Sequence, residues 1–105
     1  MYAFLLYLLS IVHGGFRFEP LEENVLVDVV NLKPKVETFL TSQGYNGIFP
    51  EGPIEEVWGQ LVNGKNYIVK IKDGYNYLCI RYFKSFDGYM DFETAKPCTS
   101  MKDLI

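Results

Sequence analysis

Residues 66–72 read Asn-Tyr-Ile-Val-Lys-Ile-Lys, and this stretch decides the fold class of the chain. Side chains in a strand point alternately to opposite faces, so Tyr67, Val69 and Ile71 share one face and the two lysines share the other. The next two residues, Asp-Gly, are typical of a tight turn between antiparallel strands. The stretch therefore predicts a strand of an antiparallel sheet that has an apolar face.

Further strands are predicted on both sides of this one. Residues 55–61 are interpreted as the preceding strand and residues 77–84 as the following strand. A second Asp-Gly pair, Asp87-Gly88, turns the chain into a last strand over residues 89–95. In the strand over residues 77–84, the apolar side chains that share one face are Leu78, Ile80 and Tyr82.

Residues 22–41 have the period of a helix, and Gly44 follows as a stop signal. Pro34 interrupts the pattern because it cannot donate a hydrogen bond to the carbonyl of Val30, so we expect a bend or a tolerated break there. A helix followed by antiparallel strands predicts an α+β fold, with one long helix packed on a twisted antiparallel sheet. The apolar side chains that recur at steps of three and four residues, on one stripe of the helix, are Val25, Val29, Leu32, Val36 and Phe39.

The composition limits the class of protein. The chain has 105 residues, 10 basic and 13 acidic side chains and a net charge of −3, which fits one globular domain. It has no cluster of Lys or Arg, so we expect neither a nucleic-acid partner nor an anionic membrane surface. One His and two Cys are too few for a zinc site without an unusual ligand, and we expect no metal and no cofactor. The sequence shows neither the paired carboxylates nor the Cys–His dyad that would indicate an enzyme, so we expect the protein not to be one.

The N-terminal residues differ from the rest of the chain. Residues 1–16 contain no charged side chain, and residues 2–9 form a continuous apolar run. This run is too short to span a bilayer, which takes about 20 residues, but it suits a secretory signal peptide. We therefore expect residues 1–14 to be a signal peptide cleaved after Ser10 or after Gly14, residues 15–105 to be a single domain, and the protein to be secreted. The alternative is an apolar N-terminal strand or tail that stays attached.

Five segments of the chain resemble the cystatins, which inhibit papain-like cysteine proteases. Residues 60–64, Gln-Leu-Val-Asn-Gly, match the Gln-x-Val-x-Gly motif of that family. Residues 66–71 are similar to the strand that follows the motif, residues 32–37 resemble the Lys-Pro segment in the helix of the stefin branch, and residues 82–85 resemble a later stefin strand. Gly14-Gly15 stands where the family has its N-terminal glycine. The resemblance runs in the same order from Gly14 to about residue 96.

The resemblance implies how the protein acts. A cystatin fills the active-site cleft of the protease with a wedge made of the N-terminal glycine region and two hairpins, and it needs no catalysis of its own. We expect Asn63 and Gly64 to make a tight turn, because both residue types tolerate positive φ. We expect the protein to be a monomer. The residues that the resemblance assigns to protease binding are Gly14, Gly15, Gln60, Leu61, Val62, Asn63, Gly64, Phe86 and Asp87.

Other interpretations of these residues remain open. Val62-Asn63-Gly64 can be an ordinary hairpin turn, and Phe86 can be a core or edge aromatic side chain. The second hairpin lacks the proline that the family carries there. The alternative functions are a binding module of the cystatin fold without inhibition, and an inhibitor of exopeptidases with weak affinity for endopeptidases.

The resemblance also bears on the two cysteines. The secreted branch of the family closes a disulfide between places that correspond to Cys79 and Cys98, whereas the stefin branch has none. The resemblance therefore implies a disulfide between Cys79 and Cys98, and two unpaired thiols are the alternative.

Overall fold

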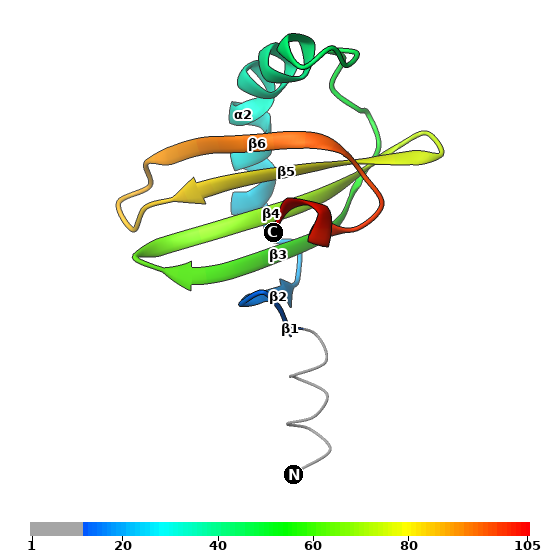
Figure 1. The fold of residues 1–105 in the computed structure, drawn as a ribbon. Helices are drawn as coiled ribbons and strands as arrows, with labels where there is room; N and C mark the ends of the chain where they lie inside the picture. The colour runs from blue at the N-terminus through cyan, green and yellow to red at the C-terminus, as the bar shows by residue number, and fades with distance from the viewer. Residues whose placement is uncertain (1–11) are drawn as a thin grey trace.

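The computed structural model describes residues 12–105 of the chain (Figure 1). In chain order, the elements of this part are β1 (Val12–His13), β2 (Phe16–Glu19), α2 (Glu23–Ser42), β3 (Ile54–Val62), β4 (Gly64–Asp73), β5 (Asn76–Lys84), β6 (Met90–Cys98) and a 3-10 turn, η1 (Met101–Leu104). The predicted signal peptide falls almost entirely in residues 1–11, outside the described residues, as does its cleavage site after Ser10. No helix within residues 12–105 is both long enough and apolar enough to cross a membrane.

Within residues 12–105, six strands form one antiparallel sheet whose spatial order, β1 to β6, is also their order in the chain. Helix α2 crosses one face of the sheet, and η1 lies on the opposite face (Figure 1). This arrangement confirms the predicted α+β class and is consistent with a cystatin-like architecture.

Helix α2 forms where the periodicity predicted it. Four of the five stripe residues are buried against the sheet, and Phe39 is partly buried beside Phe92 of β6. The helix passes through Pro34 without interruption. The carbonyl that loses its hydrogen bond belongs to Val30, which lies on the exposed side of the helix where water can replace the bond. Of the two expected outcomes, the helix therefore shows the second: Pro34 removes one hydrogen bond and the helix tolerates the loss.

The main core lies between α2 and the sheet. As predicted, the apolar face of β4 meets that of β5 beneath the helix, and the rings of Tyr67 and Tyr82 stack with their centroids 5.1 Å apart. Asp28 of α2 is also buried here, at 4% exposure. Its carboxylate accepts hydrogen bonds from the Tyr82 hydroxyl at 3.0 Å and from Lys84 Nζ at 2.9 Å, so the buried charge has partners on β5.

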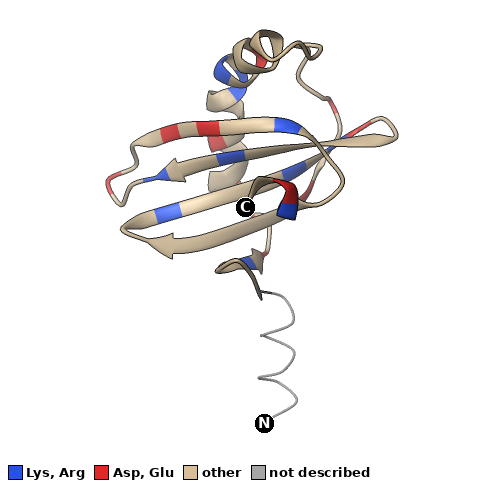
Figure 2. Cartoon of the chain, in the orientation of Figure 1, with Lys and Arg blue, Asp and Glu red and all other residues tan. Residues whose placement is uncertain are grey.

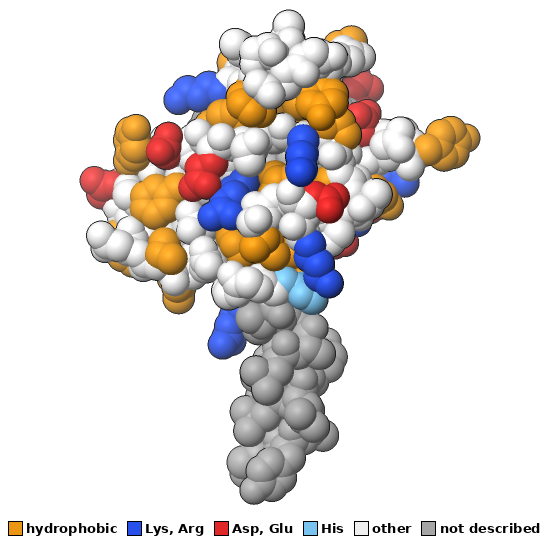
Figure 3. Space-filling view, in the orientation of Figure 1, with side chains coloured by type: hydrophobic (Ala, Val, Ile, Leu, Met, Phe, Trp, Pro, Cys, Tyr) orange, Lys and Arg blue, Asp and Glu red, His pale blue; other side chains and the backbone are white. Residues whose placement is uncertain are grey.

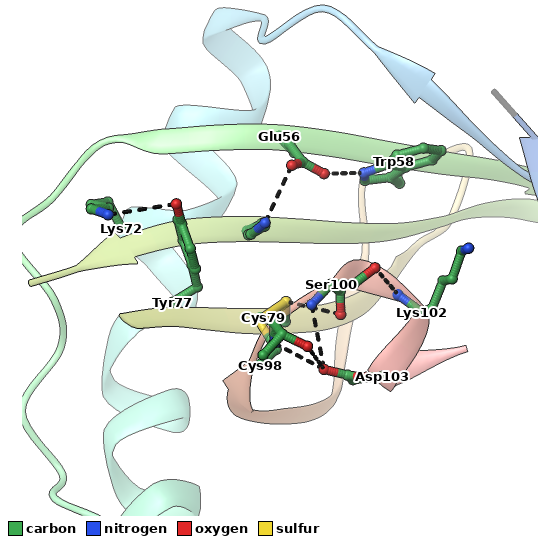
Figure 4. Close-up of polar contacts among 11 residues, drawn as sticks. Glu56, Trp58, Lys72, Tyr77, Cys79, Cys98, Ser100, Lys102 and Asp103 are labelled. Atoms are coloured by element: carbon green, nitrogen blue, oxygen red, sulfur yellow. Dashed lines mark hydrogen bonds and ion pairs between the residues drawn. A yellow bond between two sulfur atoms is a disulfide. The ribbon is translucent and has the colours of Figure 1, made fainter. Parts of the chain in front are cut away.

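A second apolar cluster lies on the other face of the sheet, which the alternation pattern did not predict. Turn η1 covers this face of the sheet (Figure 4). Asp103 fixes the start of η1 by accepting a hydrogen bond from the backbone N–H of Thr99 at 2.9 Å, and the N–H of Lys102 donates to Ser100 Oγ at 3.2 Å. The buried members of the cluster are Phe16, Trp58, Ile68, Cys79, Cys98, Met101 and Leu104.

Cys79 and Cys98 form a disulfide inside this second cluster (Figure 4). Their Cα atoms are 5.7 Å apart, and the bond joins β5 to the end of β6. The pairing that the resemblance implied is therefore present in the structure, and neither cysteine is a free thiol.

Candidate functional site

Three turns lie at one end of the sheet, and they contain all nine residues that the sequence singled out. The antiparallel registers bring them together: β2 pairs Arg17 with Gly59, and β4 pairs Lys65 with Lys84. We call this end the three-turn edge and define it by Gly14-Gly15, residues 60–64 and residues 85–89. The β3–β4 and β5–β6 turns of this edge are at the left of Figure 1.

The N-terminal turn is a hairpin. Strand β1 pairs with β2, with His13 opposite Phe16, and Gly14 and Gly15 form the two-residue loop between them. Their φ angles of 58° and 81° are those of a type I′ turn, which glycine adopts readily. Because β1 runs antiparallel to β2, Val12 lies behind the turn and not beyond its tip.

Gln60 ties this N-terminal turn to the first hairpin. Its side-chain Nε2 donates a hydrogen bond to the carbonyl oxygen of Gly14 at 3.0 Å. Its Oε1 accepts one from Asn66 Nδ2 at 2.9 Å, across the β3–β4 pair. Both ends of the amide are therefore used within the chain, and the amide has a fixed orientation. Asn66 was not singled out from the sequence, although the short turn after Gln60 places the two residues opposite each other.

The first hairpin has a tighter tip than predicted. The register pairs Val62 with Gly64, so Asn63 alone turns the chain. We expected positive φ angles to be available at both Asn63 and Gly64, but among the described residues only glycines have a positive φ. At this tip the positive φ angle belongs to Gly64 alone, at 122°. Leu61 is 75% exposed and Val62 is about half exposed. The tip therefore presents two apolar side chains to solvent beside a turn that is tightly closed.

Gly64 itself is buried beneath the second hairpin. A side-chain carbon added at Gly64 would lie 2.6 Å from Cε1 of Phe83 and 2.9 Å from the carbonyl oxygen of Lys84. The structure places Gly64 where a bare backbone is needed for β4 to approach β5, whereas Leu61 and Val62 are the accessible part of the motif.

The second hairpin presents Phe86 to solvent. Phe86 is 77% exposed, so it is not a core side chain. The backbone N–H of Ser85 donates to the Tyr89 carbonyl at 2.8 Å, which closes the turn. Asp87 accepts hydrogen bonds from the Ser85 hydroxyl and from the backbone N–H of Tyr89, and these bonds hold the pKa of the Asp87 carboxyl below its usual value.

One ion pair lies between the first two turns of the three-turn edge. Lys65 Nζ lies 2.7 Å from Glu19 Oε1. Burial acts to lower the pKa of Lys65, but the hydrogen bond and the charge of Glu19 outweigh burial, so the pKa is raised. The β3–β4 tip carries no charge, and an acidic residue marks the β5–β6 turn (Figure 2). In the space-filling view, hydrophobic side chains gather along this edge with acidic ones among them (Figure 3).

The three-turn edge presents a surface that a partner could contact. A hollow of about 390 Å³ lies between the first two turns, lined by Gly15, Leu61 and the Glu19–Lys65 ion pair. Among residues 12–105, no three His, Cys, Asp or Glu side chains are grouped as metal ligands would be. What the edge offers is a set of exposed apolar tips on a hydrogen-bonded frame. The chain matches no protein-family model, no curated protein and no solved structure.

Proposed function

We propose that this protein is a reversible, competitive inhibitor of papain-like cysteine proteases, which it binds through the three-turn edge. One observation supports this proposal most directly. The segments that resemble the cystatin wedge are distant in the chain, at residues 14–15, 60–64 and 86–87, yet they form a single edge in the folded chain. The exposed apolar side chains at this edge, Leu61, Val62 and Phe86, suit an uncharged cleft.

The shape of the edge also explains how an inhibitor could enter such a cleft without being cut. A protease cleaves a peptide that it can hold in an extended form. Asn63 is the single residue between two paired strands, so this tip cannot be extended without breaking the β3–β4 register. A tip already fixed by its hydrogen bonds loses little conformational entropy on binding, which favours affinity from a small contact area.

The proposed setting is extracellular, and the proposed form is a monomer that is not an enzyme. The disulfide between Cys79 and Cys98 supports secretion, because disulfides persist in oxidising compartments. The partner would be a protease of the papain type, with no nucleic acid, membrane or cofactor involved.

A second candidate function is a binding module of the same fold that does not inhibit proteases. The closed N-terminal hairpin favours this candidate, because Val12 and His13 pair with β2 and do not extend past the tip.

Titration of papain with the purified, disulfide-bonded chain tests the proposal. We expect activity to fall in proportion to added inhibitor, to recover on dilution and to recover when the substrate concentration is raised. Trypsin, whose serine nucleophile lies in a differently shaped cleft, serves as the control and should keep its activity. Full papain activity at a large excess of the chain would instead support the binding module.

A further inference from the structure

We propose that Gln60 is a positioning residue that holds the N-terminal hairpin closed, and that the protease meets this hairpin as a folded turn and not as an extended strand. The second half of this inference rests on the proposed function. The first half concerns the free protein that keeps Val12–Gly14, cleaved after Ser10 or not at all, and it stands on the contacts of these residues alone.

Several contacts hold the hairpin closed. The N–H of the Gln60 amide bonds the Gly14 carbonyl at 3.0 Å, at the one place where β1 turns into β2. Asn66 holds the other end of the same amide at 2.9 Å, which prevents the Gln60 side chain from swinging away. The ring of His13 packs on the ring of Trp58, with centroids 5.3 Å apart, and Phe16 is buried in the second cluster.

Opening the hairpin would break these contacts together. An extended N-terminal strand requires β1 to leave β2, the Gly14 carbonyl to lose Gln60, and His13 to leave Trp58. The binding surface already present in the free chain is the turn itself, with Gly15 beside Gln60 and Leu61. Binding the closed form avoids the cost of opening, so the preformed turn is the form that a partner selects.

The role of Gln60 is tested without any protease. Gln60→Glu keeps the acceptor for Asn66 but replaces the donor to Gly14 with a second oxygen. We expect amide hydrogen exchange over residues 12–16 to become faster by about fivefold or more, the factor for the loss of one hydrogen bond. Trp58 is the only tryptophan in the chain and packs on His13, so its emission should shift as well.

The matched control is Gln43→Glu, the same change in charge at the exposed end of α2. It should leave exchange over residues 12–16 and the Trp58 emission unchanged. If Gln60→Glu behaves like Gln43→Glu, Gln60 does not hold the hairpin and this half of the inference is wrong.

The form that binds is tested by locking the hairpin. Val12 and Arg17 are directly opposite in the β1–β2 pair, so Val12→Cys/Arg17→Cys can join the two strands by a disulfide. Peptide mapping would first establish that Cys79 and Cys98 remain paired with each other. The reference is Val12→Ser/Arg17→Ser, which removes the same side chains without a lock.

We expect the locked variant to inhibit papain as strongly as the reference. Inhibition weakened tenfold or more by the lock would mean that the hairpin must open, and would overturn the second half of the inference. If the unaltered chain and the reference both fail to inhibit, the proposed function is wrong. The claim that a protease binds the closed hairpin is then wrong as well. The exchange experiment on Gln60→Glu still decides the role of Gln60 in that case.

Discussion

The hydroxyl of Tyr82 donates a hydrogen bond of 3.0 Å to Asp28, which joins the C-terminal half of β5 to the buried side of α2. Lys84, two residues further along β5, donates to the other carboxylate oxygen at 2.9 Å. Asp28→Ala removes both acceptors and leaves the buried Tyr82 hydroxyl without a partner. We expect the free energy of unfolding in urea to fall by about 2–4 kcal/mol. Asp28→Asn, which keeps an acceptor, should cost less; equal losses would contradict this account.

The same contact predicts how stability depends on pH. Burial, the charge of Asp28 and the hydrogen bond all raise the pKa of the Tyr82 hydroxyl above the ordinary tyrosine value. Above about pH 10 the unfolded chain releases this proton while the folded chain keeps it, so the free energy of unfolding falls by about 1.4 kcal/mol per pH unit from this group. Below that pH the contribution is fully present. Tyr82→Phe should make the alkaline slope shallower, and an unchanged slope would argue against this group.

Leu61 is the tip side chain whose replacement tests the three-turn edge most cleanly. Because it is 75% exposed, Leu61→Glu should change the free energy of unfolding by less than about 0.5 kcal/mol. A charge forced into an apolar contact should nevertheless weaken inhibition of papain by about tenfold or more. Tyr75→Glu is the control, since Tyr75 is fully exposed in the β4–β5 turn at the other end of the sheet. Equal inhibition by the two variants would remove Leu61 from the binding surface.

Phe86 tests the contribution of the second hairpin. Phe86→Ser removes an exposed ring, and Tyr75→Ser removes one at the opposite end of the sheet. We expect only Phe86→Ser to weaken inhibition, with both proteins as stable as the parent in urea. If Phe86→Ser inhibits as well as Tyr75→Ser, the second hairpin does not contact the protease through this ring.

Gly64→Val should damage both folding and inhibition. The φ angle of 122° and the contacts with Phe83 and Lys84 leave no room for a side chain, and strain of this kind costs about 1–3 kcal/mol before the collision is counted. Gly74→Val provides a reference, since Gly74 has a φ of 62° and open space around it. Urea unfolding should separate the two, with the larger loss at Gly64. A Gly64→Val protein as stable as Gly74→Val would contradict the packing described at this position.

The disulfide can be tested by mass and by stability. The bond spans 19 residues, and closing a loop of this length stabilises a fold by about 3 kcal/mol. Intact-mass analysis should show no alkylation of the purified protein until a reductant is added. Cys79→Ala/Cys98→Ala should lower the urea midpoint and leave the three-turn edge, at the far end of β5, still able to inhibit.

The sequence predicted the elements whose apolar period is long enough to read. The stripe from Val25 to Val36 located α2 within one residue at each end, and the alternation of Tyr67, Val69 and Ile71 gave the face of β4 that meets it. Asp28 was missed because a polar residue does not count toward an apolar stripe. Its place three residues after Val25 and four before Leu32 was the signal that it would be buried.

The N-terminal hairpin and the second cluster could not be obtained in the same way. Strand β1 has two residues, too few to show a period, although Gly-Gly is a dipeptide typical of two-residue hairpins. Ile68 and Cys79 alternate with residues of the main core, so they point to the opposite face of the sheet. The alternation alone does not tell whether that face is exposed to solvent or covered. What buries them is η1, which the apolar patterns did not predict.

The order of the strands has a consequence for how quickly the chain can fold. From β3 to β6, each strand pairs with the next one along the chain across a short turn, so these contacts can form after little chain has been brought together. Pairing β2 with β3 is different, because α2 lies between them and a long loop must be closed. In refolding experiments that follow amide protection in time, we expect the β3–β6 meander to become protected first. The N-terminal strands should pair afterwards and bring the turn at Gly14-Gly15 with them. This turn would then complete a three-turn edge whose other two turns, β3–β4 and β5–β6, have already formed.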